Sequence, residues 1–227
     1  MLLLSTIHDP AGKLALPTVV CLKFLADVYE GMVFCVTYNT HPDTIEALGI
    51  FAILSNAEGA ANGRRCALEI GLKTESQVFH YCDGDRILFW ALRYHDELRD
   101  SVKKWKNTDR LVVLGRTRQA FKTHPLFQRV TESIANLSSL SGVDYLSGSR
   151  IIPRDITIKI LAQSKSDNAA AIDLEWPKIA GSFYYDQVDG LSYEHKLFGL
   201  EKPFKQEIKT RLSNMVHSIG TQWLTVK

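Results

Sequence analysis

The chain has 227 residues, 45% of them hydrophobic and 23% charged, and a formal net charge of +2. These values are ordinary for a globular protein and allow one large domain with a continuous core. The nearly balanced charge excludes a bulk electrostatic need for nucleic acid as a partner.

Strand and helix signals alternate along the first 120 residues, with short connections between them. Continuous apolar runs predict buried strands, and apolar residues at helical spacing predict helices. Strands that alternate with helices indicate a mostly parallel sheet covered on both faces, a three-layer α/β/α fold. In chain order the prediction is a strand at 2–7, a helix at 16–29, strands at 32–37 and 50–54 around a short helix at 43–48, a loop at 55–59, a helix at 61–72 and a strand at 76–82.

The remaining sequence continues this pattern less regularly. Its last element has apolar residues at helical spacing and is amphipathic. No internal repeat, low-complexity segment or linker interrupts the chain, so we expect a single domain. The predicted elements are one or two helices over 86–106, a strand at 111–114, a helix at 124–140, a strand pair or irregular strand over 143–153, helices at 154–163 and 169–180, a strand at 182–188 and a helix at 204–223.

Cysteine usage and the N-terminus both favour a cytoplasmic protein. The four cysteines form no CxxC pair and lie in apolar or strand-like surroundings, so we expect buried, reduced thiols. The first apolar run is too short for a signal peptide, lacks a basic region and ends at His8-Asp9-Pro10. No apolar stretch approaches the roughly 20 residues needed to cross a bilayer.

The strongest local motif is Asp83-Gly84-Asp85, which directly follows the apolar strand at 76–82. Two carboxylates one residue apart repel each other unless a cation lies between them. Glycine at the middle position lets the backbone turn and lets a ligand come close. Mg²⁺ or Mn²⁺ held by these carboxylates takes further ligands from a diphosphate and water. The alternative is a polar strand-to-helix turn in which Asp85 caps the helix.

A second motif precedes the aspartates by about twenty residues. The loop from Gly59 to Gly63 is rich in small residues and leads into Arg64 and Arg65 at the start of a helix. Free backbone N–H groups and two guanidinium groups suit a nucleotide diphosphate. Arginine is unfavourable at a helix N-terminus, which favours a binding role over that of a solvated charge.

This order of elements resembles the nucleotide-binding half of GT-A-type glycosyltransferases, nearest to the family 2 pattern. The resemblance covers about residues 1–120 in order and spacing, and residues 140–190 more loosely. It implies that His8 and Asp9, after the first strand, and Asn39, after the second, bind the base and ribose. It also implies that Arg64 or Arg65 binds the donor and that Asp83 and Asp85 bind the metal and the sugar or ribose. The second strand end carries Tyr38-Asn39 where that family usually has an acidic residue.

The resemblance divides the single domain, residues 1–227, into a nucleotide-binding half at 1–120, an acceptor half at 121–200 and a C-terminal amphipathic helix at 201–227. It also implies a catalytic carboxylate downstream of the aspartates, where Asp173 and Glu175 stand. An inverting transferase needs such a base to accept the proton of the acceptor hydroxyl. An exposed helical face is the alternative for this pair.

Two further residues are candidates for the site. Retaining GT-A enzymes often use a downstream histidine as a third metal ligand, and His195 is placed to do so, although surface histidines are common. Arg116 follows a buried strand and is a candidate to bind the leaving diphosphate or an anionic acceptor. A solvated loop is the alternative at that position.

Several functions compete with that of a metal-dependent glycosyltransferase. A sugar nucleotidyltransferase shares the fold, but it normally shows a Gly-rich basic loop after the first strand, and residues 7–13 match this only faintly. A non-catalytic nucleotide-sugar binding protein would keep the aspartates without a working base. The acceptor is unknown, either a small molecule or lipid-linked. The basic amphipathic C-terminal helix allows a peripheral membrane contact, but packing against the domain or a second subunit, as in a homodimer, is favoured.

Overall fold

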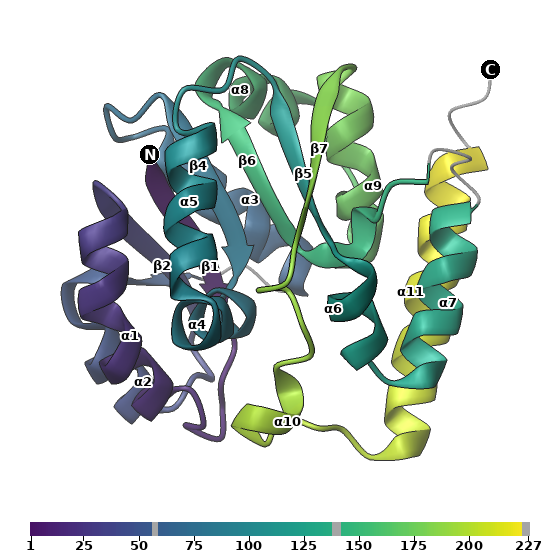
Figure 1. Cartoon of the computed structure of the whole chain (residues 1–227), viewed down its shortest axis with the longest axis horizontal. Coiled ribbons are helices and arrows are strands. Elements are labelled where there is room, and N and C mark those ends of the chain that lie inside the picture. Colours follow the sequence, from purple (N-terminus) through teal and green to yellow (C-terminus); the bar gives the residue numbers. More distant parts are fainter. Residues whose placement is uncertain (56–58, 138–141, 224–227) are drawn as a thin grey trace.

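The computed structural model describes residues 1–55, 59–137 and 142–223. Within them, seven strands form one sheet in the order β3-β2-β1-β4-β6-β5-β7 (Figure 1). Neighbouring strands are parallel except around β6, which runs antiparallel to both β4 and β5. The mostly parallel sheet is therefore confirmed. The strands are β1 (Leu2–Ile7), β2 (Gly31–Thr37), β3 (Ala52–Ser55), β4 (Val78–Asp83), β5 (Leu111–Arg116), β6 (Ser149–Pro153) and β7 (Phe183–Val188).

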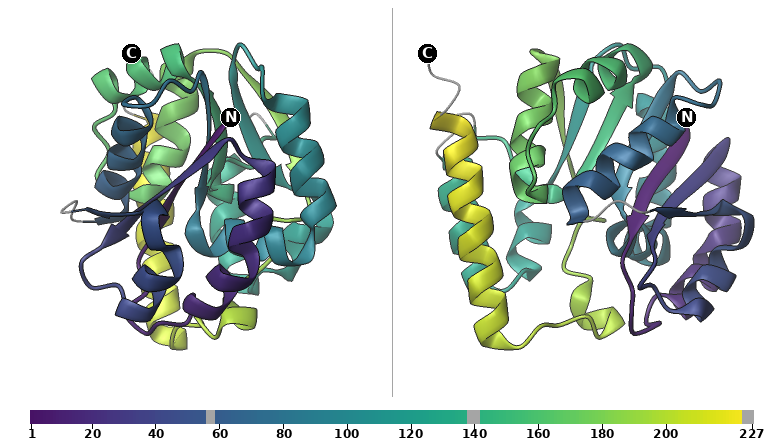
Figure 2. Two further views of the ribbon diagram at one scale, coloured as in Figure 1. Left: turned by 90° about the vertical axis from the view of Figure 1, so that its left-hand side faces the viewer. Right: turned by 180° about the vertical axis from the view of Figure 1, so that it is seen from behind.

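Helices lie on both faces of the sheet, as the views from the side and from behind show (Figure 2). The described helices are α1 (Ala15–Val28), α2 (Pro42–Leu48), α3 (Gly59–Gly71), α4 (Gly84–Arg93), α5 (His95–Trp105), α6 (Arg118–Thr123), α7 (Leu126–Leu137), α8 (Arg154–Gln163), α9 (Ala169–Ala180), α10 (His195–Phe198) and α11 (Phe204–Trp223), with 3-10 turns η1 (Gly49–Phe51) and η2 (Tyr145–Ser147).

The core consists of two apolar layers, one on each side of the sheet. Side chains alternate between the faces of a strand, so Leu3 of β1 joins the layer beneath α1, α4 and α5, and Leu4 joins the layer beneath α3, α8 and α9. Trp90 fills the first layer and Trp176 the second, both nearly inaccessible to solvent. Both faces of β1, β2, β4 and β5 are thus covered, which explains the largely apolar sequences of these strands.

The structure differs from the predicted elements at several places, and it adds α6 and α10, for which no helix was predicted. Residues 49–51 form the turn η1, so the third strand begins at Ala52 and not at 50. The region 143–153 forms the turn η2 and then β6, separated by Gly148, whose φ of +73° interrupts a strand. Residues 56–58 of a predicted loop, 138–140 of a predicted helix and the chain end at 224–227 lie outside the described residues.

The parallel strands β1, β2 and β4 bring their carboxyl ends to one edge of the sheet. Thr6 of β1 is in register with Cys35 of β2 on one side and with Asp83 of β4 on the other. The loops that follow these three strands, and the start of α3, therefore meet at this edge. Ligands of open parallel sheets bind at such edges.

The C-terminal helix α11 packs along α7 and α9, and α7 lies beside it in Figure 1. Arg211 of α11 donates to the side-chain oxygen of Gln128 on α7 at 2.7 Å. Asn214 accepts a hydrogen bond from Asn168, the N-cap of α9, at 3.2 Å. Of the two favoured alternatives, the domain or a second subunit, the structure shows packing against the domain, and a second subunit stays a prediction. Among the described helices, none is both long enough and apolar enough to span a bilayer.

Candidate active site

A cavity of about 1070 Å³ opens at the carboxyl ends of β1, β2 and β4. Its walls come from the ends of these strands, the start of α3, the start of α9 and the segment between α10 and α11. Five of the residues predicted to form the site line it: His8, Asn39, Arg64, Asp83 and Asp85. Thr37 also lines it, and its hydroxyl lies 2.8 Å from Nδ1 of His8.

The turn between β4 and α4 sends the two aspartates to different partners. A Cβ atom on Gly84 would lie 2.4 Å from Cγ1 of Ile7 and 2.8 Å from the carbonyl oxygen of Thr6. Only glycine fits there, because β4 turns into α4 directly against β1. Asp83 ends the strand and Asp85 lies in the first turn of the helix.

Asp83 is paired with Arg64, the buried arginine of α3. Arg64 donates to the two carboxylate oxygens of Asp83 at 3.0 and 2.9 Å, and Tyr81 donates its hydroxyl to Oδ1 at 2.8 Å. The other terminal nitrogen of Arg64 donates to Oδ1 of Asp173 at 2.9 Å. Burial lowers the pKa of Arg64, but the negative charges of Asp173 and Asp83 have the larger effect. The pKa of Arg64 is therefore raised well above the usual range.

Arg64 thus connects the aspartate motif to Asp173, although Arg64 and Asp173 are 109 residues apart in the sequence. Asp173 lines a smaller cavity of about 140 Å³, which shares Arg64 and Asp83 with the large one. Burial raises the pKa of Asp173, although Arg64 and Arg150 oppose this shift. A carboxylate with a perturbed pKa beside a cavity is a candidate for proton transfer or for binding a hydroxyl.

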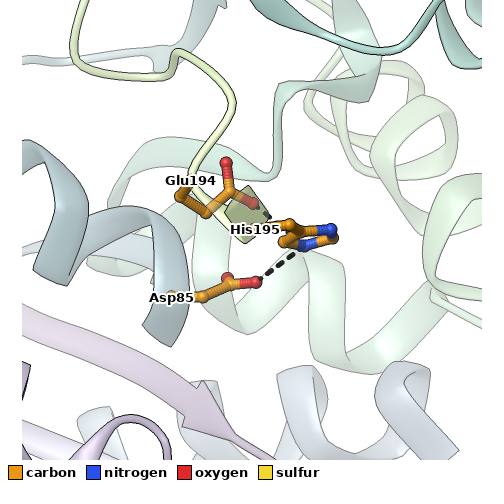
Figure 3. A group of neighbouring side chains, drawn as sticks. All are labelled: Asp85, Glu194 and His195. Atoms are coloured by element: carbon orange, nitrogen blue, oxygen red, sulfur yellow. Dashed lines mark hydrogen bonds and ion pairs between the residues drawn. The ribbon is translucent and has the colours of Figure 1, made fainter. Parts of the chain in front are cut away.

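Asp85 meets His195 and Glu194, which stand at the start of α10 (Figure 3). Nε2 of His195 lies 3.2 Å from Oδ2 of Asp85 and 3.1 Å from Oε1 of Glu194. One ligand atom from each residue lies within 4.8 Å of the others. Burial opposes the charge on His195, but the hydrogen bonds to Asp85 and Glu194 raise its pKa to about 9. The three side chains therefore hold a proton where they could hold a cation.

This donor set fits a divalent cation. Two carboxylates and one imidazole are suitable ligands for Mn²⁺, and the carboxylates also suit Mg²⁺. Glu194 is 1% exposed, and its Oε2 has no hydrogen-bond partner among the described residues. Binding of a cation would displace the proton shared with His195. The structure thus brings the predicted Asp85 and His195 together, while Asp83 turns toward Arg64.

Sequence reasoning missed Glu194, Arg86 and Gly148. Glu194 directly precedes His195, which was predicted as a metal ligand, so the Glu-His pair could have indicated a second ligand. Arg86 lies 3.8 Å from Oδ2 of Asp83 and lines the smaller cavity. Gly148 supplies the carbonyl that accepts the backbone N–H of Asp83 at 3.1 Å. No local sequence pattern connects Gly148 to the aspartates.

Two predicted binding residues, Asp9 and Arg116, lie outside the cavity lining and have structural partners. The Asp9 carboxylate accepts the backbone N–H groups of Lys13 and Leu14 at 3.0 and 2.8 Å, and so fixes the loop before α1. Arg116 is fully buried, with ion pairs of 2.7 Å to both Glu132 and Asp144. Its partners already satisfy the charge, and none of them lies in the large cavity.

Arg65 and Glu175 also lie outside the cavity lining, and both contact the loop that leads to α9. Arg65 donates to the carbonyl oxygen of Ser166 at 2.8 Å. Glu175 accepts the hydroxyl of Ser164 at 2.6 Å and the backbone N–H of Lys165 at 2.8 Å. Of the two carboxylates predicted to be catalytic, Asp173 lines the smaller of these two cavities, and Glu175 lines neither of them.

Solved structures of glycosyltransferases share the fold of this chain. A crystal structure of glucosyl-3-phosphoglycerate synthase from Mycobacterium tuberculosis matches 98% of this chain and 80% of its own, with a TM-score of 0.64 and 9% identity. The chain has the GT-A glycosyltransferase fold. A complex of that enzyme with Mn²⁺, UDP-glucose and glycerol 3-phosphate matches 98% of this chain and 79% of its own, with a TM-score of 0.62 and 8% identity. A complex with UDP matches 96% and 79%, with a TM-score of 0.58 and 9% identity.

The GT-A resemblance indicated by the order of elements is therefore confirmed for the fold. The synthase structures contain Mn²⁺ or Mg²⁺ together with UDP or UDP-glucose. No protein-family model matches the chain, and no curated protein matches it by sequence. At 8–9% identity the likeness shows a shared fold and nothing more. Function must therefore be argued from the chain's own residues.

Proposed function

We propose that this protein is a divalent-metal-dependent glycosyltransferase that takes a nucleotide sugar as donor. One observation carries the proposal: Asp85 and His195, 110 residues apart in the sequence, meet with Glu194 beside the cavity at the strand ends. When the bond between the sugar and the diphosphate breaks, negative charge develops on the leaving diphosphate. A metal ion at this group would neutralise that charge. The Mn²⁺ and UDP-glucose in the related synthase structure support this assignment.

The cavity offers separate regions for the parts of a nucleotide sugar. His8, Thr37 and Asn39 line the side formed by β1 and β2, and we assign the base and ribose to them. The diphosphate then lies toward Asp85 and its partners. The sugar lies toward Asp83 and the smaller cavity, where carboxylate and guanidinium groups can bind its hydroxyls.

Asp173 is the stronger candidate for the carboxylate near the reacting bond. It faces the smaller cavity and contacts Arg64, which also holds Asp83. Glu175 accepts two backbone N–H groups and a hydroxyl in the loop at 164–166, so its oxygens are already in use. We therefore assign Asp173 to the acceptor or sugar hydroxyl and Glu175 to the loop.

The test is the melting temperature of the protein with UDP, GDP and their sugars, with and without Mn²⁺. A ligand at a hundred times its Kd stabilises the fold by about 2.7 kcal/mol. For a chain of this size that raises the melting temperature by about 5–10 °C. We expect a metal-dependent rise that is lost in Asp85→Asn and in His195→Ala. Asp186→Asn is the control, because Asp186 pairs with Lys104 and lies outside both cavities.

The same samples separate the competing functions. A glycosyltransferase releases a nucleoside diphosphate from the nucleotide sugar, whereas a sugar nucleotidyltransferase releases diphosphate from a nucleoside triphosphate and a sugar phosphate. A binding protein shows the thermal shift and no turnover with any acceptor. The absence of a shift with every nucleotide, in the presence of Mn²⁺, would refute the proposal.

A further inference from the structure

Two thiols lie in contact at the wall of the large cavity. Sγ of Cys35 is 3.9 Å from Sγ of Cys66, and both cysteines are free. Cys35 belongs to β2, is buried and lines the cavity. Cys66 belongs to α3 and is partly exposed, and the hydroxyl of Ser55 donates to its sulfur at 3.4 Å. The pair therefore joins the nucleotide side of the cavity to the helix that carries Arg64.

We propose that Cys35 and Cys66 are an oxidative modification site, where a peroxide forms an intramolecular disulfide that weakens binding of the nucleotide. The effect on binding rests on the proposed function, whereas the disulfide itself does not. The site joins a cavity-lining thiol to one that a small oxidant can reach.

The reaction proceeds in two balanced steps. The partly exposed Cys66 thiolate attacks hydrogen peroxide, which gives a sulfenic acid and hydroxide. The Cys35 thiol then displaces the hydroxyl of that sulfenic acid, so the sulfur–sulfur bond forms and water leaves. In sum, two thiols and one peroxide give one disulfide and two waters. Burial and the neighbouring Cys66 raise the pKa of Cys35, which makes Cys66 the thiol that reacts first.

The bond requires a movement that reaches the binding site. A disulfide has a sulfur–sulfur length of about 2.05 Å, so the two sulfurs, now 3.9 Å apart, must approach each other. β2 is hydrogen-bonded between β1 and β3, so the easier movement is that of α3 toward the sheet. Two positions before Cys66, Arg64 holds Asp83 and Asp173. Oxidation therefore narrows the cavity and displaces this arginine.

The other two cysteines supply a matched control. Cys21 and Cys82 are both buried in the apolar layer on the opposite face of the sheet from Cys35. Sγ of Cys21 donates to the carbonyl oxygen of Leu88 at 3.5 Å. A variant with Cys21→Ser and Cys82→Ser keeps the reactive pair, whereas Cys66→Ser removes one member of it at a partly exposed position.

The experiment treats the full chain with hydrogen peroxide and follows three quantities. Intact mass and thiol titration report the bond, peptide mapping identifies the linked cysteines, and titration with UDP and Mn²⁺ gives the Kd before and after oxidation. We expect the loss of two thiols in a Cys35–Cys66 peptide and a Kd weakened about tenfold, which is the effect of losing about one hydrogen bond to the nucleotide. Dithiothreitol should restore both. Cys66→Ser should keep its affinity under peroxide, and the Cys21→Ser, Cys82→Ser variant should behave as wild type.

Either half of the proposal can fail separately. Oxidation to sulfinic acid without a cross-link, or a cross-link between other cysteines, overturns the modification site. A Cys35–Cys66 bond that leaves the Kd unchanged overturns its effect on binding. If the reduced protein binds no nucleotide at all, the proposed function fails, and mass and peptide mapping still decide whether the disulfide forms.

Discussion

Replacing Gly148 with alanine would push a methyl group into the aspartate motif. A Cβ atom at this position would lie 2.4 Å from Oδ2 of Asp83 and 3.2 Å from Nε of Arg86. Real Cβ atoms do not approach oxygen so closely, so the Asp83 carboxylate must turn away. Gly148 also has a φ of +73°, which alanine adopts only with strain.

The size of the effect follows from the bonds that Asp83 would lose. The left-handed backbone costs alanine about 1–2 kcal/mol. The carboxylate need turn only far enough to give up one of its hydrogen bonds with Arg64 and Tyr81, and a bond to a charged group contributes about 1.5–3 kcal/mol. We therefore expect Gly148→Ala to lower the free energy of unfolding by about 3–5 kcal/mol.

Gly199→Ala isolates the backbone cost. Gly199 has the same left-handed conformation, with φ +64° and ψ +29°, and a Cβ there would meet only Lys13, no closer than 3.5 Å. Its loss should be about 1–2 kcal/mol. Urea unfolding of both variants measures the difference, and UDP titration with Mn²⁺ should show weaker binding for Gly148→Ala alone. If Gly148→Ala and Gly199→Ala lower the free energy of unfolding by amounts that agree within about 0.5 kcal/mol, the steric reasoning is wrong.

Three further predictions concern ionisable side chains. Burial lowers the pKa of His80 to about 3, so it stays neutral when folded, while the unfolded chain takes up a proton below about pH 6.5. Stability therefore falls as the pH drops toward 3, and urea unfolding should show that His80→Gln removes about 2 kcal/mol of the decline between about pH 6.5 and 4.5. Arg116→Met leaves the buried carboxylates of Glu132 and Asp144 without their cation. It should lower the free energy of unfolding, measured with urea, by about 3–5 kcal/mol. Asp173→Asn should lower turnover about 100-fold or more, and Glu175→Gln less than about tenfold, in a nucleoside diphosphate release assay.

Much of the fold could be predicted because its signals are local. The helices at residues 154–163 and 169–180 were predicted at their observed bounds. Helices cover both faces of β1, β2, β4 and β5, so each of these strands is a largely apolar run in the sequence. The reversed direction of β6 has no such signal. Strand direction depends on which neighbours pair, and these contacts lie far apart in the sequence.

Part of the site was predictable for a topological reason. Parallel strands share one edge, so the polar residues that follow them, His8, Asn39 and Asp83, must meet there. Asp9 follows the same strand as His8, yet its carboxylate caps the backbone before α1. An aspartate at a loop-helix junction suits both roles, and only the tertiary structure separates them.

The two aspartates of the motif have different roles in the proposed mechanism. A DxD pattern alone does not indicate this difference. Asp85 faces His195 and Glu194, and Asp83 faces Arg64, which also binds Asp173. A metal at the first group and a sugar at the second would then be held by different carboxylates of the same turn. Gly84 makes this division possible, because its close packing against β1 fixes the turn. The diphosphate and the sugar of a single donor can therefore be held by adjacent residues without competition for the same carboxylate.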